Sequence, residues 1–337
     1  MRVGTVCYAT TQGLGVLAKQ FWDHDVIQDV LIFQHPNGRP THREWYPEDT
    51  PVLTTRPFRG MQVNDFLDRV DVVLFFETPF DWDFVRKCRD HKVKTAVIPM
   101  YEWHLEHPPH SMDLYINPSL LDQQYFPQGT FIPIPSVSGI WKQRERAWSF
   151  VHNSGHIGSR NHKGTEELLK AMPDVESPIT LTITSQERLL DSLVSKVPGI
   201  RDDSRITFKI QDNLSYTDLF AEGDIYIAPE KYNGLSLPLQ EAFAAGMGVM
   251  TTNRFPANTW LPEPLLIPVE RYGRARTQRG HLEFDEAIVD PVVIAHTIDQ
   301  WYGQDISAYS VLGREWAEAN SWEVLKPKYL EALGSLV

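Results

Sequence analysis

The sequence YNGLSLPLQEAFAAG, residues 232–246, combines residue types that suit a helix start facing an anion. We predict that a helix begins near Leu237, because Pro238 is well tolerated in the first helical turn, where its missing N–H costs nothing. The amides at this helix start would be unpaired and would point outward, with the positive end of the helix dipole behind them. They belong to Leu235, Ser236 and Leu237. This arrangement suits a phosphate or diphosphate group.

Two further residues of this segment fit the same chemistry. Gly234 has no side chain, so the backbone there can approach a ligand closely. Glu241 lies about one turn inside the predicted helix, where its carboxylate is placed to accept hydrogen bonds from the two hydroxyls of a ribose. The alternative interpretation is a buried strand–helix unit that ends at Gly246 and binds nothing.

A glycine-rich turn, ATTQGLGVLAKQFW, follows the first predicted strand. The amides around Gly13 and Gly15 could hold an anion. Tight packing of the following helix on the strand explains the two glycines equally well.

These residues lie in a chain that alternates short apolar strands with helices. Runs such as RVDVVLFFET and HKVKTAVIPMY are separated by helix-like segments such as FDWDFVRKCRDH. Near-continuous apolar strands separated by helices are typical of a parallel sheet that is covered on both faces. The pattern begins again after a segment rich in Pro, Gly and Ser at 129–147, so we predict two doubly wound α/β domains joined near 135–147.

Residues 229–249, PEKYNGLSLPLQEAFAAGMGV, resemble the donor-site signature of retaining GT-B glycosyltransferases, the family that contains the sucrose and glycogen synthases. That family carries two acidic residues at a fixed spacing. Glu241 matches the second, and Asn233 stands where the first is expected. Asn233 keeps a hydrogen-bonding group but no negative charge. Either the contacts to the transferred sugar therefore differ, or Glu230 substitutes for the missing acid.

A second match covers residues 150–172, FVHNSGHIGSRNHKGTEELLKAM, which resemble the strand, loop and helix with which this family clamps the donor diphosphate. Lys163 matches the family's lysine. His156 occupies the usual place of the clamping arginine, with Arg160 nearby. The resemblance implies that Lys163, assisted by Arg160 or His156, neutralises the leaving diphosphate. The alternative for Lys163 is a solvated lysine at a helix start.

The resemblance also implies the GT-B fold, in which two Rossmann-like α/β domains face a central cleft and a C-terminal helix crosses back. We predict an acceptor-binding domain at 1–138, a nucleotide-sugar-binding domain at 139–305, and C-terminal helices at 306–337 that pack toward the first domain. In such a fold, the glycine-rich turn of the first domain lies across the cleft from the donor phosphates.

The co-substrate implied by the resemblance is a nucleotide-diphosphate sugar, with a UDP-sugar favoured, and no metal or other cofactor is needed. After the predicted strand that ends near Tyr101, many members carry a cleft histidine. In this chain the corresponding place is Tyr101 or Glu102, so a phenol or a carboxylate is a candidate to face the acceptor hydroxyl. The implied catalytic residues are Lys163, Arg160, His156 and Glu102. The implied donor-binding residues are Gly13, Gly15, Asn233, Gly234, Leu235, Ser236, Leu237 and Glu241.

The acceptor is less clearly indicated. The compact form resembles members found in bacteriophage genomes, which implies 5-hydroxymethylated pyrimidines in double-stranded DNA as a candidate acceptor; such a base would have to be flipped out of the duplex. Arginines in loop-like segments could contact DNA phosphates. They are Arg39, Arg43, Arg56, Arg59, Arg271, Arg274, Arg276 and Arg279.

Several alternatives stand beside this acceptor. The arginine-rich segments fit solvated loops of an acidic protein equally well. The acceptor could instead be a glycan, a lipid-linked sugar or a small metabolite. From a different class, the chain could bind sugar nucleotides without transferring the sugar, because Asn233 replaces the usual acid and the clamping arginine is missing from its place.

Composition sets further limits. The 32 basic and 44 acidic residues give a formal net charge of -12, which argues against nucleic-acid binding over the whole surface. The 2 cysteines form no disulfide framework, so we expect a reduced, cytoplasmic setting. No apolar run approaches the roughly 20 residues that span a bilayer, and we find no basic amphipathic helix for a membrane surface. The oligomeric state stays open.

Overall fold

The structure of the protein is a computed structural model that describes residues 1–103, 108–136, 140–155, 162–186, 190–210, 216–276 and 283–337. The chain divides into two compact units. The first unit comprises Met1–Pro135, Arg276–Glu283 and Trp322–Val337, and the second comprises Ser136–Ala275 and Phe284–Ser321.

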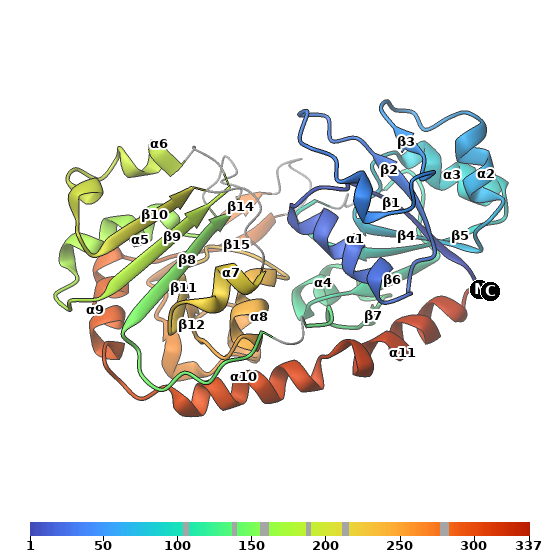
Figure 1. Cartoon of the computed structure of the whole chain (residues 1–337). Helices are drawn as coiled ribbons and strands as arrows, with labels where there is room; N and C mark the ends of the chain where they lie inside the picture. Colours follow the sequence, from blue (N-terminus) through green and yellow to red (C-terminus); the bar gives the residue numbers. More distant parts are fainter. Residues whose placement is uncertain (104–107, 137–139, 156–161, 187–189, 211–215, 277–282) are drawn as a thin grey trace. The chain divides into compact units, whose positions relative to one another are not determined.

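The first unit is built on a seven-stranded sheet in the order β3-β2-β1-β4-β5-β6-β7 (Figure 1). Its strands are β1 (Val3–Cys7), β2 (Asp29–Phe33), β3 (Val52–Leu53), β4 (Val72–Glu77), β5 (Lys94–Pro99), β6 (Leu114–Asn117) and β7 (Thr130–Phe131). Neighbouring strands run parallel, and β1 and β2 are buried along their whole length. This burial explains the near-continuous apolar runs from which the strands were predicted. The two-residue strands β3 and β7 carry too little pattern to predict.

The first unit also contains helices, most of which pack on this sheet. They are α1 (Gly13–Asp23), α2 (Met61–Leu67), α3 (Trp82–Asp90), α4 (Leu120–Tyr125) and α11 (Trp322–Gly334). The ring of Phe21 on α1 lies 5.2 Å from Phe76 of β4 and 5.0 Å from each of Trp322 and Tyr329 on α11. The C-terminal helix is therefore anchored in the aromatic core of the first unit, as the predicted fold requires.

The second unit repeats this plan with a six-stranded parallel sheet in the order β10-β9-β8-β11-β12-β13. Its strands are β8 (Ser149–Gly155), β9 (Thr180–Ser185), β10 (Ile206–Ile210), β11 (Ile225–Ala228), β12 (Gly248–Thr252) and β13 (Leu266–Ile267). Its helices are α5 (Thr165–Ala171), α6 (Leu190–Val194), α7 (Tyr216–Ala221), α8 (Leu237–Ala244), α9 (Pro291–Trp301) and α10 (Ser307–Ala319). Short 3-10 helices occupy Arg43–Trp45, Met172–Asp174, Ile200–Asp202, Ala257–Thr259 and Glu263–Leu265.

Two separate hydrophobic clusters cover this second sheet. One includes Leu168 of α5 and Ile294 of α9, and the other includes Leu239 and Phe243 of α8. In both sheets the strand order reverses beside the first strand, between β1 and β4 in one and between β8 and β11 in the other. This is the order of doubly wound Rossmann-like domains. The predicted pair of doubly wound α/β domains is confirmed.

Two further strands form a separate two-stranded sheet, β14 (Arg271–Arg276) with β15 (Glu283–Ile288). We expected a loop-like segment here, and over Arg271–Arg276 that prediction is wrong. Arginines of β14 form ion pairs with acids of β15. A guanidinium nitrogen of Arg274 lies 2.6 Å from a carboxylate oxygen of Asp285, and one of Arg276 lies 2.8 Å from a carboxylate oxygen of Glu283. Opposite charges on facing strands stabilise a sheet, and the composition of one strand alone does not reveal them.

Candidate functional site

The loops after β8 and β11 flank the point where the strand order of the second unit reverses. In open α/β sheets, ligands bind outside the carboxyl ends of the strands at this position. Lys163 lies in the loop after β8, and the turn Pro229–Ser236 connects β11 to α8. The two segments singled out in the sequence are therefore brought to the same edge of one sheet.

Backbone contacts hold these two loops together. The amide of Lys231 donates to the carbonyl of His162 over 2.7 Å. Gly164 has a φ of +71°, and a Cβ at this position would meet the carbonyl oxygen of Pro229 at 2.0 Å. Only glycine adopts this conformation without strain and leaves room for that approach. Lys163, which precedes Gly164, is thus fixed relative to the turn after β11.

The amine of Lys163 lies close to the C-terminal end of β8. Gly155, the last residue of that strand, has a φ of +55°, and a Cβ on it would lie 2.7 Å from Nζ of Lys163. Burial lowers the pKa of Lys163 from its ordinary value, while the carboxylates of Glu230 and Glu241 act in the opposite direction. An ammonium in such desolvated surroundings interacts strongly with an incoming anion.

The turn before α8 differs in one respect from our expectation. Oδ1 of Asn233 accepts hydrogen bonds from the amides of Leu235, over 3.2 Å, and Ser236, over 2.9 Å. The prediction that these two amides are unpaired is therefore wrong, because the Asn233 side chain folds back onto its own turn, as Asn often does. The amide of Leu237 has no hydrogen-bond partner among the described residues.

The helix itself begins at Leu237, as predicted, with Pro238 in its first turn. Ser236, immediately before it, has a φ of +40°, a conformation that a non-glycine residue adopts only when its surroundings impose it. Gly234 is buried in the turn. Glu241 lies one turn into α8, is 7% exposed, and is close enough to influence the pKa of Lys163.

Glu230 and Arg254 form a buried ion pair beside the turn. Their side chains are 1% and 4% exposed. Arg254 follows β12 and donates to the carbonyl of Asn233 over 2.7 Å as well. Glu230 also accepts from the hydroxyl of Ser236 over 2.7 Å. Its carboxylate is thus occupied by protein partners.

The first unit contributes the glycine-rich turn. Gly15 lies inside α1, and a Cβ there would meet the carbonyl oxygen of Thr10 at 2.1 Å, so its packing against the loop requires glycine. Gly13 opens the helix, is exposed, and would leave an added Cβ with no atom within 4 Å. Of the two, only Gly13 leaves open space beside the backbone.

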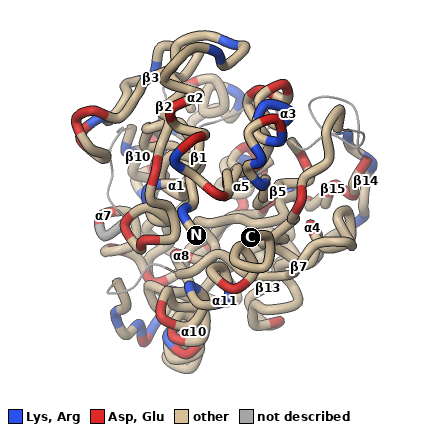
Figure 2. Tube along the Cα trace, turned by 90° about the vertical axis from the view of Figure 1, so that its right-hand side faces the viewer, with Lys and Arg blue, Asp and Glu red and all other residues tan. Residues whose placement is uncertain are grey.

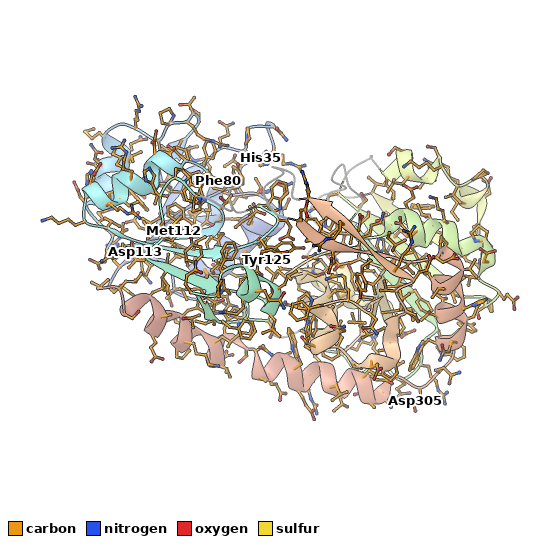
Figure 3. All side chains as sticks on the ribbon, turned by 180° about the vertical axis from the view of Figure 1, so that it is seen from behind. His35, Phe80, Met112, Asp113, Tyr125 and Asp305 are labelled. Atoms are coloured by element: carbon orange, nitrogen blue, oxygen red, sulfur yellow. The ribbon has the colours of Figure 1, made fainter. Side chains whose placement is uncertain are left out.

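Glu102 lies in a turn after β5, at the same edge of the first sheet as the glycine-rich turn after β1. Its neighbour Tyr101 is buried and stacks on Tyr125 with ring centroids 5.0 Å apart; Figure 3 labels Tyr125. The amide of Tyr101 donates to the buried carboxylate of Asp122 over 2.9 Å. Burial raises the pKa of Asp122 to about 7. The backbone beside Glu102 is therefore firmly held.

Residues 151–264 match the sequence model of the family described as Glycosyl transferases group 1. The match covers about a third of the chain. The match contains Lys163, the turn before α8, and Glu241. Over these residues the match supports the predicted glycosyltransferase family and, with it, the predicted enzyme class, a glycosyltransferase.

Solved structures of low sequence identity share the fold. The structure of HepE from Anabaena in complex with UDP and glucose is 12% identical, with a TM-score of 0.66 over 99% of this chain and 100% of that chain. Sucrose-phosphate synthase from Thermosynechococcus elongatus is 14% identical, with a TM-score of 0.65 over 100% of this chain and 99% of that chain. The lipopolysaccharide outer core galactosyltransferase WaaB is 10% identical, with a TM-score of 0.64 over 100% of both chains. These likenesses confirm the predicted GT-B fold. No curated protein matches the sequence.

Within the matched residues, two predicted site residues, His156 and Arg160, lie outside the described part of the chain. Sequence reasoning missed Arg254. Its only signal was an arginine directly after a strand of the second domain, and nothing in its spacing from Glu230 announces an ion pair. Gly155 was visible only as the end of the strand before the loop, not as a contact of Lys163.

The arginines proposed for DNA contact are distributed over both units. Figure 2 shows basic residues along β14, where Arg274 and Arg276 are paired with acids of β15. In the first unit, Arg56 and Arg59 are exposed, and Arg56 donates to the carbonyl of Phe80 over 2.7 Å. Arg279 lies outside the described residues.

The described part of the chain contains no group of three His, Cys, Asp or Glu side chains placed to hold a metal ion. Asp81 and Asp83, an Asp-x-Asp pair, belong instead to the start of α3, where Asp81 caps the helix by accepting from the amide of Asp83 over 3.1 Å. Among the described helices, none is both long and apolar enough to cross a bilayer.

Proposed function

We propose that this glycosyltransferase moves a sugar, with retention of configuration, from a UDP-sugar to an acceptor hydroxyl. The observation that carries the proposal is the position of Lys163. Its amine lies at the reversal point of the second sheet, near Glu241 and beside the start of α8. A diphosphate at this point would meet one cation and the positive end of a helix.

Catalysis here is mainly electrostatic. The bond from the sugar to the diphosphate breaks, and negative charge grows on the leaving diphosphate, so a cation fixed in a water-poor site lowers the barrier. Lys163 supplies that cation, and Arg160 or His156 assists. Glu241 holds the ribose hydroxyls. The acceptor oxygen bonds to the sugar on the face that the diphosphate leaves, and the leaving phosphate takes the acceptor proton.

A UDP-sugar is favoured as the donor. HepE, which shares the fold over its whole length, has been crystallised in complex with UDP and with UDP-glucose. We propose that no metal or other cofactor is required, because Lys163 performs the charge neutralisation. Turnover that survives a chelator supports this part of the proposal, and turnover that depends on an added divalent cation contradicts it.

For the acceptor, we propose a 5-hydroxymethylated pyrimidine in phage DNA, with Glu102 facing the acceptor hydroxyl. The exposed Arg56 and Arg59 of the first unit would contact DNA phosphates. The ion pairs of Arg274 and Arg276 reduce the charge that β14 offers to DNA. A glycan, a lipid-linked sugar or a small metabolite is the alternative acceptor. We also propose a cytoplasmic location, because Cys7 and Cys88 are both buried free thiols.

One experiment tests these proposals together. The protein is incubated with a panel of nucleotide sugars and candidate acceptors, hydroxymethylated and unmodified DNA included, and the products are weighed by mass spectrometry. A hexose or pentose added only to hydroxymethylated DNA supports the full proposal. Sugar added to another acceptor supports the proposed transferase activity and contradicts the proposed acceptor. Tight UDP-sugar binding with neither transfer nor hydrolysis would make the chain a binding protein.

A further inference from the structure

The turn between β11 and α8 is tied to Arg254, a residue that follows β12 and lies outside the predicted site. The guanidinium contacts two residues of the turn, one near its start and one in its middle. Its Nε donates to the carbonyl of Glu230 over 3.2 Å, and one terminal nitrogen donates to the carbonyl of Asn233 over 2.7 Å. The other terminal nitrogen pairs with the carboxylate of Glu230. One planar guanidinium, which donates several hydrogen bonds, therefore fixes the positions of several acceptors at once.

Glu230 connects Arg254 to the rest of the turn. Its second carboxylate oxygen accepts from the hydroxyl of Ser236 over 2.7 Å and from the side-chain amide of Asn233 over 3.4 Å. Asn233 in turn binds the amides of Leu235 and Ser236 through Oδ1. A continuous set of contacts thus runs from Arg254 to the residues at which α8 begins.

Two features of this set cost free energy and persist only when the contacts are complete. Glu230 and Arg254 are charged and almost fully buried, and removing one partner leaves the other charge buried without compensation. Ser236 has a left-handed φ of +40°, which the surrounding contacts must impose. Both costs fall on the segment that our proposed function assigns to the donor.

We propose that Arg254 is a positioning residue of the donor site: through Glu230 and Asn233 it sets the backbone of the turn that receives the nucleotide sugar. This inference rests on the proposed function. It also accounts for the departure at Asn233. The carboxylate of Glu230 is bound to Arg254 and Ser236, so Glu230 does not replace the missing acid at the sugar. Asn233 instead stabilises the turn by accepting hydrogen bonds from two of its amides.

The test compares Arg254→Lys and Arg254→Met with a matched control, Arg144→Met. Arg144 is also buried, and within the described part of the chain it donates only to backbone carbonyls, those of Lys142, Phe220 and Gly223. Each variant is measured for thermal unfolding, for UDP affinity by calorimetry, and for donor KM and kcat in the transfer or hydrolysis assay. Arg254→Lys keeps the buried charge and guards against a variant that fails to fold.

Arg254→Met is expected to weaken UDP binding and to raise donor KM by about tenfold or more, the scale of one lost charged contact. Arg254→Lys should lie between this variant and the wild type, and kcat should change less than KM in both. Arg144→Met should lower the unfolding temperature without changing UDP affinity. Folded Arg254 variants with wild-type donor KM overturn the inference. A wild-type protein that binds no sugar nucleotide overturns the proposed function instead, so the two failures are distinguishable.

Discussion

The guanidinium of Arg254 lies against the carboxylate of Glu230 in a pair whose side chains are 4% and 1% exposed. The pair joins the ends of β11 and β12 at the edge of the sheet where Lys163 and Glu241 also lie. Because Arg254 neutralises Glu230, this buried carboxylate repels a bound diphosphate less than an unpaired one would. In our proposal, Lys163 is then the cation, among the described residues of this edge, that the donor diphosphate meets.

Replacing Lys163 by alanine should reduce turnover by about two orders of magnitude or more, since the leaving diphosphate loses a charge-stabilising donor. The change is measured as kcat with a saturating nucleotide sugar. Lys196→Ala is the matched control, because Lys196 is an exposed lysine that pairs with Glu166 on the same unit. Near-normal turnover in Lys163→Ala would count against the assigned site.

Activity should also fall at alkaline pH earlier than an exposed lysine would allow. Burial lowers the pKa of Lys163 below its ordinary 10.5. The ammonium form is present below that lowered pKa and is lost as the pH rises through it, so donor kcat/KM should decline over this range. Lys163→Arg should move the decline to higher pH, because a guanidinium stays charged. The idea fails if both proteins lose kcat/KM over the same pH range.

Glu241→Gln should weaken UDP binding by about tenfold, the scale of hydrogen bonds to a charged group. The reason is that the carboxylate accepts from both ribose hydroxyls in our assignment. Calorimetry with UDP and 2′-deoxy-UDP separates this role from a general effect on the site. The wild type should discriminate strongly between the two nucleotides and the variant only weakly. Equal discrimination between the two nucleotides by both proteins would contradict the assignment of Glu241 to the ribose.

The fold was predictable because its strands are buried on both faces and read as apolar runs. β4, VVLFFE, is an example: five of its six residues are buried. The start of α8 was predictable for a different reason, since Pro238 marks a first helical turn. Both signals are local in sequence.

The remaining features of the site depend on contacts between distant residues. Arg254 meets Glu230 only because β11 and β12 are neighbours in the sheet, and no residue near Arg254 in sequence reveals this. The capping of two amides by Asn233 depends on which of several side-chain rotamers the buried turn imposes. The strand β14 likewise depends on its acidic partner β15.

The two glycines of the first turn should behave differently when each is replaced by alanine. Gly15→Ala should lower the free energy of unfolding by about 1–3 kcal/mol, because its Cβ would meet a backbone carbonyl at 2.1 Å. Gly13→Ala should change it by less than about 0.5 kcal/mol, since no atom lies within 4 Å of the added group. Chemical denaturation of both variants checks this, and equal losses would show that packing does not explain Gly15.

The most direct test of the account is a crystal structure of the protein with UDP. We predict that the diphosphate contacts Nζ of Lys163 beside the start of α8, with the ribose hydroxyls on the carboxylate of Glu241. A nucleotide bound elsewhere, or a diphosphate that leaves Lys163 without contact, would contradict the central claim.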